Sequence, residues 1–150
     1  GYEVKTLEQV LQRFLGFKEV HNAIIVGVGS LGGALIQDSG LSRYGLNIVA
    51  GFDINPSIVG TKLCNIPIYD IADLEYKRKS LNAEIAIIAV PVDQAQNVAD
   101  LMVANGIKAL WNFTPSRIKL SENIVVQNTS IYSHLAVMYN RLDIQKQQSK

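Results

Sequence analysis

Three glycines between an apolar run and a helix-like segment restrict the fold of this chain more than any other feature. Gly27, Gly29 and Gly32 form the pattern G-x-G-x-x-G. The apolar run 23–26 precedes the pattern and suits a strand that is buried on both faces of a parallel sheet. The helix-like segment 33–36 follows it. A strand, this pattern and a helix together predict a nucleotide-binding βαβ unit.

Each glycine of the pattern has its own expected role. Gly27 would permit the tight turn after the strand, and Gly32 would let the helix pack close to that strand. Gly29 has no Cβ, so a pyrophosphate would be able to approach the backbone there. The free N–H groups at the start of the helix, together with the helix dipole, would favour the negative charge of the phosphates.

An acidic residue closes the next apolar run at the spacing of a dinucleotide site. Asp53 ends the expected strand 46–53 and lies 21 residues after Gly32, close to the usual spacing of about 20. Its carboxylate would accept hydrogen bonds from both hydroxyls of the adenine ribose and would repel a 2′-phosphate. No Arg or Lys follows within a few positions, so the sequence favours NAD(H) over NADP(H). The alternative is that the glycines serve only packing and that Asp53 forms a turn before Asn55 and Pro56.

The rest of the chain alternates between strands and helices. Strands are expected at 66–69, 85–90, 107–111 and 124–126, and helices at 6–16, 71–81, 93–103 and 130–142, with Asp93 capping the helix 93–103. Pro67 places its strand at or near an edge. The alternation predicts an α/β fold: a Rossmann-type doubly wound parallel sheet with flanking N-terminal and C-terminal helices. The expected divisions are an N-terminal helix and lead-in (1–20), an NAD(H)-binding domain (21–128), a C-terminal helix (129–143) and a polar tail (144–150).

The composition suits one packed domain outside the membrane. The chain has 150 residues, 48% of them hydrophobic, and a formal net charge of +1, which argues against a free-standing nucleic-acid binder. No apolar run reaches the roughly 18 residues that span a bilayer. Cys64 is the single cysteine, which excludes an internal disulfide and fits a reducing, cytoplasmic compartment. Because the chain begins with Gly1 rather than Met, we expect it to be processed or part of something longer.

Two further segments follow expected strands and therefore reach the edge of the sheet where ligands bind. They are Val90 and Pro91 at the end of one strand, and Asn112, Phe113, Thr114 and Pro115 after the next. Asn112 and Thr114 would offer polar contacts to a nicotinamide amide. The alternative reading, that both segments are ordinary turns ended by proline, fits their positions equally well.

No set of catalytic residues accompanies this expected site. His21 precedes the first strand, at the opposite edge of the sheet, and His134 lies in the last helix. Cys64 has no evident His partner, which favours an inert thiol. A dehydrogenase needs an acid or base held against its substrate, so we expect that the chain is not an enzyme.

Six segments form an ordered set of motifs. They read Gly-Tyr-x-Val (1–4), Val-Gly-x-Gly-x-Leu-Gly-x-Ala-Leu (26–35), Phe-Asp-x-x-Pro-x-x-Val-Gly (52–60), Ile-Pro-Ile-Tyr (66–69), Val-Pro-x-x-x-Ala-Gln-x-Val-Ala-Asp (90–100) and Gly-Ile-Lys-Ala-x-x-Asn-Phe-x-Pro (106–115). This set resembles the family of redox-sensing transcriptional repressors called Rex, and the similarity runs from Gly1 to about Leu142. The last two segments are much more specific than the glycines.

The resemblance implies a homodimer of subunits that each hold a winged-helix DNA-binding domain and a Rossmann domain. It implies that a C-terminal helix is exchanged between subunits and that NADH binding releases operator DNA, whereas NAD⁺ is compatible with DNA binding. No reaction is catalysed in this family. The winged-helix domain lies upstream of the stretch that begins at Gly1 here, so this chain would be the sensing and dimerisation part.

The resemblance also implies which residues bind NADH or NAD⁺. The pyrophosphate would lie on the glycine-rich segment, the adenosine ribose on Asp53, and the nicotinamide near the segment 112–115. Val90 and Pro91 would line the wall of the cofactor crevice. The helix 131–142 would be the exchanged one, or else would pack on its own sheet. The expected cofactor-binding residues are Gly27, Val28, Gly29, Ser30, Leu31, Gly32, Asp53, Ile54, Val90, Pro91, Asn112, Phe113, Thr114 and Pro115.

Two positions depart from the family pattern. Asp38 stands where some members have Tyr, and Ser130 stands where most have an Asp that opens the last helix. That pair takes part in linking the cofactor to the DNA-binding domain. In this chain, discrimination against NAD⁺ would have to arise otherwise, for example from an apolar nicotinamide pocket that disfavours the pyridinium charge.

Two other functions stay open at this point. One is a CoA-binding domain, whose ligand carries a 3′-phosphate on its ribose that Asp53 would repel. The other is the cofactor half of an NAD-dependent dehydrogenase, which would need a catalytic domain beyond this chain.

Overall fold

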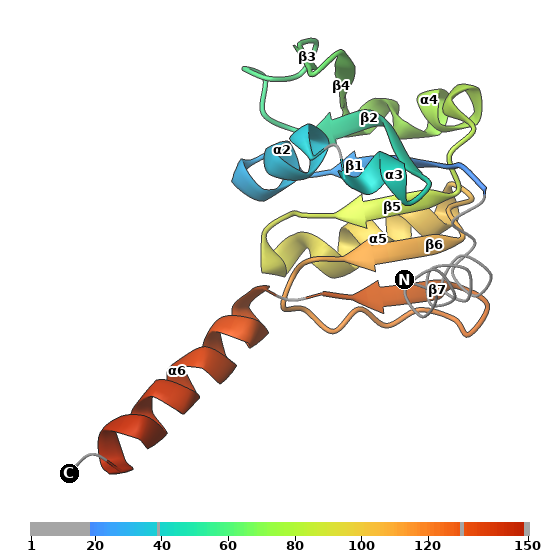
Figure 1. The fold of residues 1–150 in the computed structure, drawn as a ribbon. Coiled ribbons are helices and arrows are strands. Elements are labelled where there is room, and N and C mark those ends of the chain that lie inside the picture. The colour runs from blue at the N-terminus through green and yellow to red at the C-terminus, as the bar shows by residue number, and fades with distance from the viewer. Residues whose placement is uncertain (1–18, 39, 130, 149–150) are drawn as a thin grey trace, which may run out of the picture.

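The fold is built on one seven-stranded sheet. The computed structural model describes residues 19–38, 40–129 and 131–148. The strands lie side by side in the order β3-β4-β2-β1-β5-β6-β7 (Figure 1). Their bounds are β1 (His21–Val26), β2 (Leu46–Asp53), β3 (Lys62–Leu63), β4 (Ile66–Asp70), β5 (Ile85–Ile88), β6 (Ala109–Asn112) and β7 (Val125–Asn128).

All strand pairs except β3–β4 are parallel. Numbered along the chain without the short β3, the parallel strands follow the spatial order 3-2-1-4-5-6, which is the order of the Rossmann fold. The predicted doubly wound parallel sheet is thereby confirmed. The strand that carries Pro67 is second from the edge, covered only by the two residues of β3, also as predicted.

Helices cover both faces of the sheet. Their bounds are α2 (Ser30–Gln37), α3 (Gly40–Arg43), η1 (Ile71–Asp73), α4 (Leu74–Leu81), η2 (Val92–Gln94), α5 (Ala95–Ala104) and α6 (Ile131–Gln148). Helices α2 and α3 lie on one face, and α4 and α5 lie on the other (Figure 1). Helix α6 leaves the end of β7 and extends away from the sheet.

The core is divided by the sheet into two layers because successive strand residues point to opposite faces. Ile24 of β1 packs in the layer that holds Leu74 of α4 and Met102 of α5. Its neighbour Ile25 packs in the other layer with Ile36 of α2. The apolar runs of the sequence are therefore buried on both sides, as expected for a parallel sheet.

Several predicted boundaries were wrong. Strand β5 ends at Ile88 rather than residue 90, because the chain turns out of the sheet ahead of Pro91, which has no N–H to donate. Asp93 does not cap α5: it lies inside η2, and Gln94 precedes α5 without a side-chain cap bond. Helix α6 continues to Gln148, past the predicted helix end at 142 and into the segment predicted as a polar tail, because Gln and Lys are good helix formers. The predicted helix 6–16 lies outside the described residues.

Two short elements were not predicted. Helix α3 has only four residues and begins at a glycine, so its periodicity is too brief to detect. Strand β3 pairs with β4 through a tight turn in which Cys64 and Asn65 both have positive φ angles, +50° and +67°. This is the conformation of a two-residue hairpin loop, and the pair Cys64-Asn65 lacks the Asn-Gly or Asp-Gly signal by which such a loop is recognised in a sequence.

Candidate functional site

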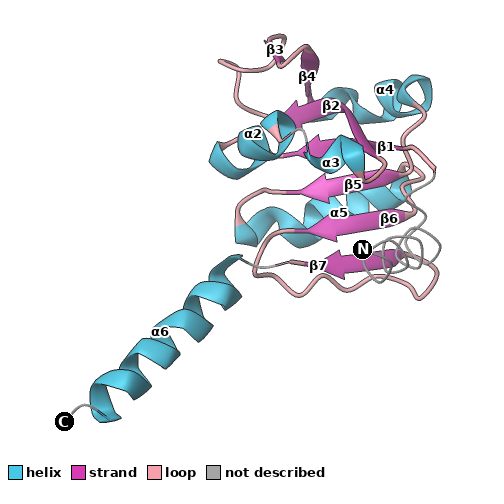
Figure 2. Cartoon of the chain, viewed as in Figure 1, coloured by secondary structure: helices cyan, strands magenta, loops and turns pink. Residues whose placement is uncertain are grey.

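The carboxyl ends of the parallel strands meet at one edge of the sheet, where the arrowheads in Figure 2 point the same way. Gly27 follows β1 at this edge with φ +92°, and its N–H donates to the carbonyl of Phe52 at 2.9 Å. A Cβ on Gly27 would lie 2.4 Å from the carbonyl oxygen of Ala89. Only glycine fits both the dihedral angle and the space, so the predicted tight-turn role is confirmed.

The other two glycines of the pattern differ sharply in their surroundings. A Cβ on Gly32 would lie 1.9 Å from the carbonyl oxygen of Gly27, so α2 approaches the turn as closely as predicted. Gly29 precedes α2, and apart from its own chain neighbours no heavy atom of the described residues lies within 4 Å of its Cβ position. The space beside Gly29 is open to a ligand, which is the geometry that a pyrophosphate would need at a helix N-terminus.

Asp53 anchors the glycine turn to its own loop. Its Oδ2 accepts the N–H of Val28 at 2.7 Å, and its Oδ1 accepts those of Ile54 and Asn55 at 2.7 and 2.9 Å. The turn-forming role of Asp53 is therefore real. An ionised carboxylate accepts about four hydrogen bonds, so Asp53 retains capacity for a ligand hydroxyl.

A cavity of about 190 Å³ opens between Asp53 and the start of α5. Phe52 forms part of its floor, and the exposed side chain of Ile54 stands at its side. Five lining residues were missed by the sequence reasoning: Val26 and Phe52, the last apolar residues of β1 and β2, and Ile71, Gln94 and Val98. Their signal was only indirect: Ile71 follows β4, and Gln94 and Val98 belong to the helix after Pro91, so both segments start at this same edge.

A second cavity, of about 440 Å³, lies on the other side of the Val90–Pro91 segment, which lines both cavities. Its described lining contains no charged side chain, and Thr114 alone brings a polar group. The lining residues are Leu31, Ala89, Val90, Pro91, Val92, Phe113, Thr114 and Pro115. Six of the predicted site residues thus surround one apolar space.

Contrary to the prediction, Asn112 does not line this cavity. Its buried side chain donates to the carbonyl of Ser116 at 2.9 Å and to Oδ1 of Asn128 at 3.0 Å. Its Oδ1 accepts the backbone N–H and the hydroxyl of Thr114 at 3.0 and 2.7 Å. With two donors and two acceptor positions all used, Asn112 shapes the loop 112–116 and has no free polar atom for a nicotinamide amide.

Gln96 holds the next loop against α5. Its Oε1 accepts the N–H of Lys119 at 2.8 Å, and its Nε2 donates to the carbonyl of Lys119 and to Asp100, both at 2.9 Å. Ala95 and Ala99 are fully buried beneath it. The motif at 90–100 therefore has three structural roles. Val90 and Pro91 line the cavities, Ala95 and Ala99 bury one face of α5, and Gln96 holds the loop at Lys119.

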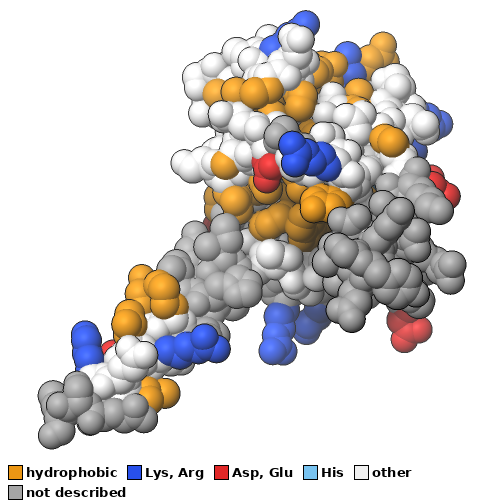
Figure 3. Space-filling model, in the orientation of Figure 1, with side chains coloured by type: hydrophobic (Ala, Val, Ile, Leu, Met, Phe, Trp, Pro, Cys, Tyr) orange, Lys and Arg blue, Asp and Glu red, His pale blue; other side chains and the backbone are white. Residues whose placement is uncertain are grey.

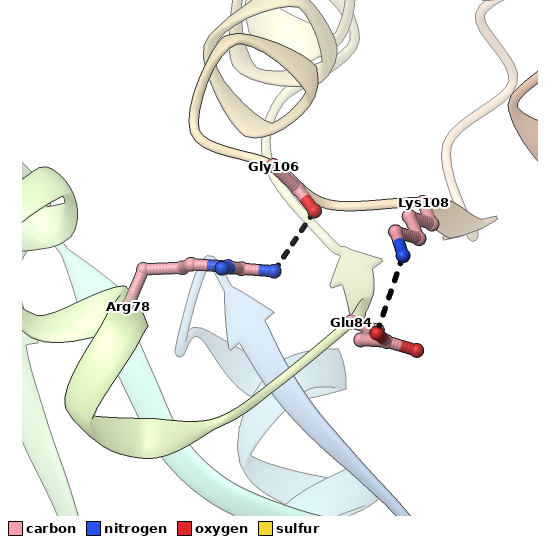
Figure 4. Close-up of polar contacts among 4 residues, drawn as sticks. All are labelled: Arg78, Glu84, Gly106 and Lys108. Atoms are coloured by element: carbon pink, nitrogen blue, oxygen red, sulfur yellow. Dashed lines mark hydrogen bonds and ion pairs between the residues drawn. The ribbon is translucent and has the colours of Figure 1, made fainter.

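The Gly-Ile-Lys-Ala segment lies at the opposite end of the sheet and has a structural role. Gly106 has φ +88°, and its carbonyl accepts a bond of 2.9 Å from Nη2 of Arg78 (Figure 4). Lys108 pairs with Glu84 at 3.5 Å between two exposed side chains, a type of contact that contributes little stability. These contacts join the turns that lead into β5 and β6.

Two of the residues considered for catalysis, His21 and Cys64, line neither cavity. His21 begins β1, with Nε2 at 3.8 Å from a carboxylate oxygen of Glu19. Cys64 is exposed in the β3–β4 turn. Within residues 19–38, 40–129 and 131–148, no group of His, Cys, Asp and Glu could hold a metal ion. None of the helices in these ranges is long and apolar enough to cross a membrane.

Comparison with known proteins agrees with this geometry. Residues 18–116 match the family model described as a CoA binding domain. The redox-sensing transcriptional repressor Rex of Bacteroides thetaiotaomicron is 57% identical over 143 residues, which cover 95% of this chain and 65% of that protein. This chain therefore spans about two thirds of the length of the curated relatives that it matches.

Solved structures of a protein named RSP share the fold. RSP in complex with β-NADH superposes with a TM-score of 0.88 at 32% identity, covering 97% of this chain and 71% of that one. RSP in complex with β-NAD⁺ and operator DNA gives the same TM-score and identity, covering 97% of this chain and 67% of that one. RSP is described as a Rex-family repressor.

Proposed function

This chain belongs to the Rex family of redox-sensing transcriptional repressors, and from that premise we propose that it is the NADH- and NAD⁺-binding sensor domain of such a repressor. The observation that carries the proposal is the pair of cavities joined at the Val90–Pro91 wall, with Gly29 and Asp53 beside them. A dinucleotide has two bases and a pyrophosphate between them, which matches two cavities linked past an open helix N-terminus.

Each group of the dinucleotide would have its own place in this site. The adenine and its ribose would occupy the 190 Å³ cavity against Ile54, with a ribose hydroxyl on Asp53. The pyrophosphate would lie on the N–H groups beside Gly29, and the nicotinamide would enter the 440 Å³ cavity. The bound cofactor supplies redox information in the charge of its nicotinamide ring. The carboxylate of Asp53 favours NAD(H) over NADP(H), because it would repel a 2′-phosphate.

Sensing would follow from the apolar character of the nicotinamide cavity. The pyridinium ring of NAD⁺ carries a positive charge, whereas the dihydropyridine ring of NADH is neutral. Moving a charge into surroundings such as Leu31, Val92 and Phe113 is costly unless an opposite charge accompanies it. The described lining supplies none, so NADH should bind more tightly than NAD⁺.

The remaining parts of the proposal concern the whole protein. Operator DNA would be bound by a winged-helix domain in the part of the relatives that this chain does not span. Helix α6 would hold two copies together, because Met138, Tyr139 and Leu142, which lie within about 100° of one another around the helix, are all about half exposed. Figure 3 shows hydrophobic side chains along its described part. Such a regulator acts in the cytoplasm and catalyses no reaction.

A thermal-shift panel with NADH, NAD⁺, NADPH and CoA tests the proposal. A ligand that binds the folded state raises the melting temperature by mass action. We expect a large shift with NADH, a smaller one with NAD⁺ and little with NADPH or CoA. A shift with CoA alone would support the ligand named by the matching family model and would overturn the sensor proposal.

A further inference from the structure

Two chains of contacts lead from the 440 Å³ cavity to the residues that precede α6. The first runs through aromatic rings. Phe113 lines the cavity, and its ring centroid lies 4.6 Å from that of Trp111. The indole Nε1 of Trp111 then donates a hydrogen bond of 2.9 Å to the hydroxyl of Thr129.

The second chain of contacts is polar. Thr114 lines the cavity, and its hydroxyl donates to Oδ1 of Asn112 at 2.7 Å. The amide of Asn112 donates to Oδ1 of Asn128 at 3.0 Å, and its backbone carbonyl accepts the N–H of Thr129 at 2.9 Å. Asn112 is completely buried, so water does not replace these partners.

The two chains of contacts reach the end of β7 and the residue after it from opposite faces of the sheet. Trp111 and Asn112 are successive residues of β6, so their side chains point to opposite faces of the sheet. Trp111 pairs in register with Gln127, and Asn112 pairs with Asn128. Helix α6 begins at Ile131, two residues after Thr129. A displacement of the loop 113–115 would therefore act on the last residues before α6 through two buried or half-buried sets of contacts.

We propose that Trp111 and Asn112 are positioning residues that transmit occupancy of the nicotinamide cavity to the direction in which α6 leaves the sheet. This inference rests on the proposed function, because it takes NADH as the occupant and α6 as the helix that joins two copies. A buried polar network has few alternative arrangements, since each broken bond leaves an unsatisfied group. NADH would favour one arrangement and so fix the exit of α6.

The test breaks both links at residues that do not line the cavity. Asn128→Leu removes the acceptor of the Asn112 amide, and Thr129→Val removes the acceptor of the Trp111 indole. Thr129→Ser is the matched control, because it keeps the hydroxyl. The NADH dissociation constant is measured by calorimetry, and backbone hydrogen exchange of residues 125–137 is measured with and without saturating NADH.

We expect NADH to slow exchange in 125–137 by about threefold or more in the unaltered chain and in Thr129→Ser. In the double variant, NADH should bind with an affinity within about threefold of the original, the usual scatter for a site without direct contact, but the slowing should vanish. Slowing that persists in the double variant would overturn the inference and leave the proposed function intact. If the unaltered chain does not bind NADH, the proposed function fails and the inference fails with it.

A second variant covers the case in which the double variant does not fold. Trp111→Phe keeps a ring beside Phe113 and lacks only the indole N–H. Its melting temperature shows whether it is folded. A folded Trp111→Phe chain should retain only part of the NADH-dependent slowing, because the Asn112 link remains. Full slowing in this variant would exclude the aromatic link.

Discussion

The carboxylate of Asp53, at the end of β2, accepts the backbone N–H of Val28 across 2.7 Å, inside the glycine turn that follows β1. This bond connects the expected ribose contact to the expected phosphate contact. Asp53 also holds the two N–H groups that follow it in the chain. A change at Asp53 therefore alters the shape of the phosphate turn as well as the ribose site.

Replacing Asp53 with alanine should weaken NADH binding roughly tenfold to a hundredfold, because hydrogen bonds to a charged group contribute about 1.5–3 kcal/mol. It should also lower the melting temperature, since three backbone N–H groups lose their acceptor. Calorimetric titration with NADH and NADPH measures the first effect. Asp53→Asn keeps the shape and removes the charge, so the preference for NADH over NADPH should fall in this variant.

The control for this prediction is Asp38→Ala. Asp38 also accepts a backbone N–H, that of Gly40 at 2.7 Å, but it lines neither cofactor cavity. Its removal should leave NADH affinity unchanged. An equal loss in both variants would mean that general destabilisation, and not the ribose contact, weakens binding.

Alanine substitutions at Gly29 and Gly32 should have different effects: the first should weaken NADH binding, and the second should destabilise the fold. A Cβ on Gly32 would overlap the carbonyl of Gly27 at 1.9 Å, so Gly32→Ala should cost several kcal/mol or prevent folding. The methyl group of Gly29→Ala would contact no described residue beyond its chain neighbours, so this change should cost about 1 kcal/mol at most, the usual loss at an N-cap. Its methyl group would nevertheless stand where the pyrophosphate approaches.

Urea denaturation and NADH titration measure the two effects. The expected result is a folded Gly29→Ala chain that binds NADH at least tenfold more weakly, beside a destabilised Gly32→Ala chain. Tight NADH binding by Gly29→Ala would place the pyrophosphate elsewhere and would contradict the proposed fit.

Substitutions at Val92 test how the site discriminates between NAD⁺ and NADH. It lines the apolar cavity and is half exposed, so a substitution there should not disturb the core. Val92→Asp would bring a carboxylate near the pyridinium ring, and a pair of opposite charges in a wet site gains about 1 kcal/mol. The affinity for NAD⁺ should therefore rise about fivefold relative to NADH. Val92→Asn, polar but neutral, should leave the ratio unchanged.

The glycine pattern and Asp53 were predictable because each role depends on local chain geometry. A positive φ angle at Gly27 and the close approach of Gly32 follow from a strand, a tight turn and a helix in succession. The buried strands were predictable for a similar reason, since a continuous apolar run such as 85–88 has no other place in an α/β fold.

The role of Asn112 was not predictable from its position alone. Its partners lie at Thr114, Ser116 and Asn128, and the last of these is brought close only by the pairing of β6 with β7. A buried Asn and an exposed Asn look alike in a sequence. Likewise, Gln96 forms hydrogen bonds with the backbone of Lys119, 23 residues further along the chain. The periodicity of a sequence does not predict contacts of that kind.

Helix α6 should join two copies of the chain, and its exposed apolar residues give the test. Met138 and Leu142 lie one turn apart on the same face, and they are 48% and 46% exposed. Burying a leucine contributes about 1.5–3 kcal/mol. Leu142→Lys should therefore raise the dimer dissociation constant at least about tenfold, because the change occurs once in each copy.

Sedimentation equilibrium over a range of concentrations measures this constant. The matched control is Asn140→Lys, which adds the same charge to an exposed position roughly on the opposite side of the helix, 160° from Leu142 at about 100° per residue. If α6 exchanges between subunits, Asn140→Lys stays dimeric while Leu142→Lys dissociates, and NADH binding survives in both because neither residue lines a cavity. A Leu142→Lys chain that remains fully dimeric would show that the two copies meet through another surface and that α6 serves a different partner.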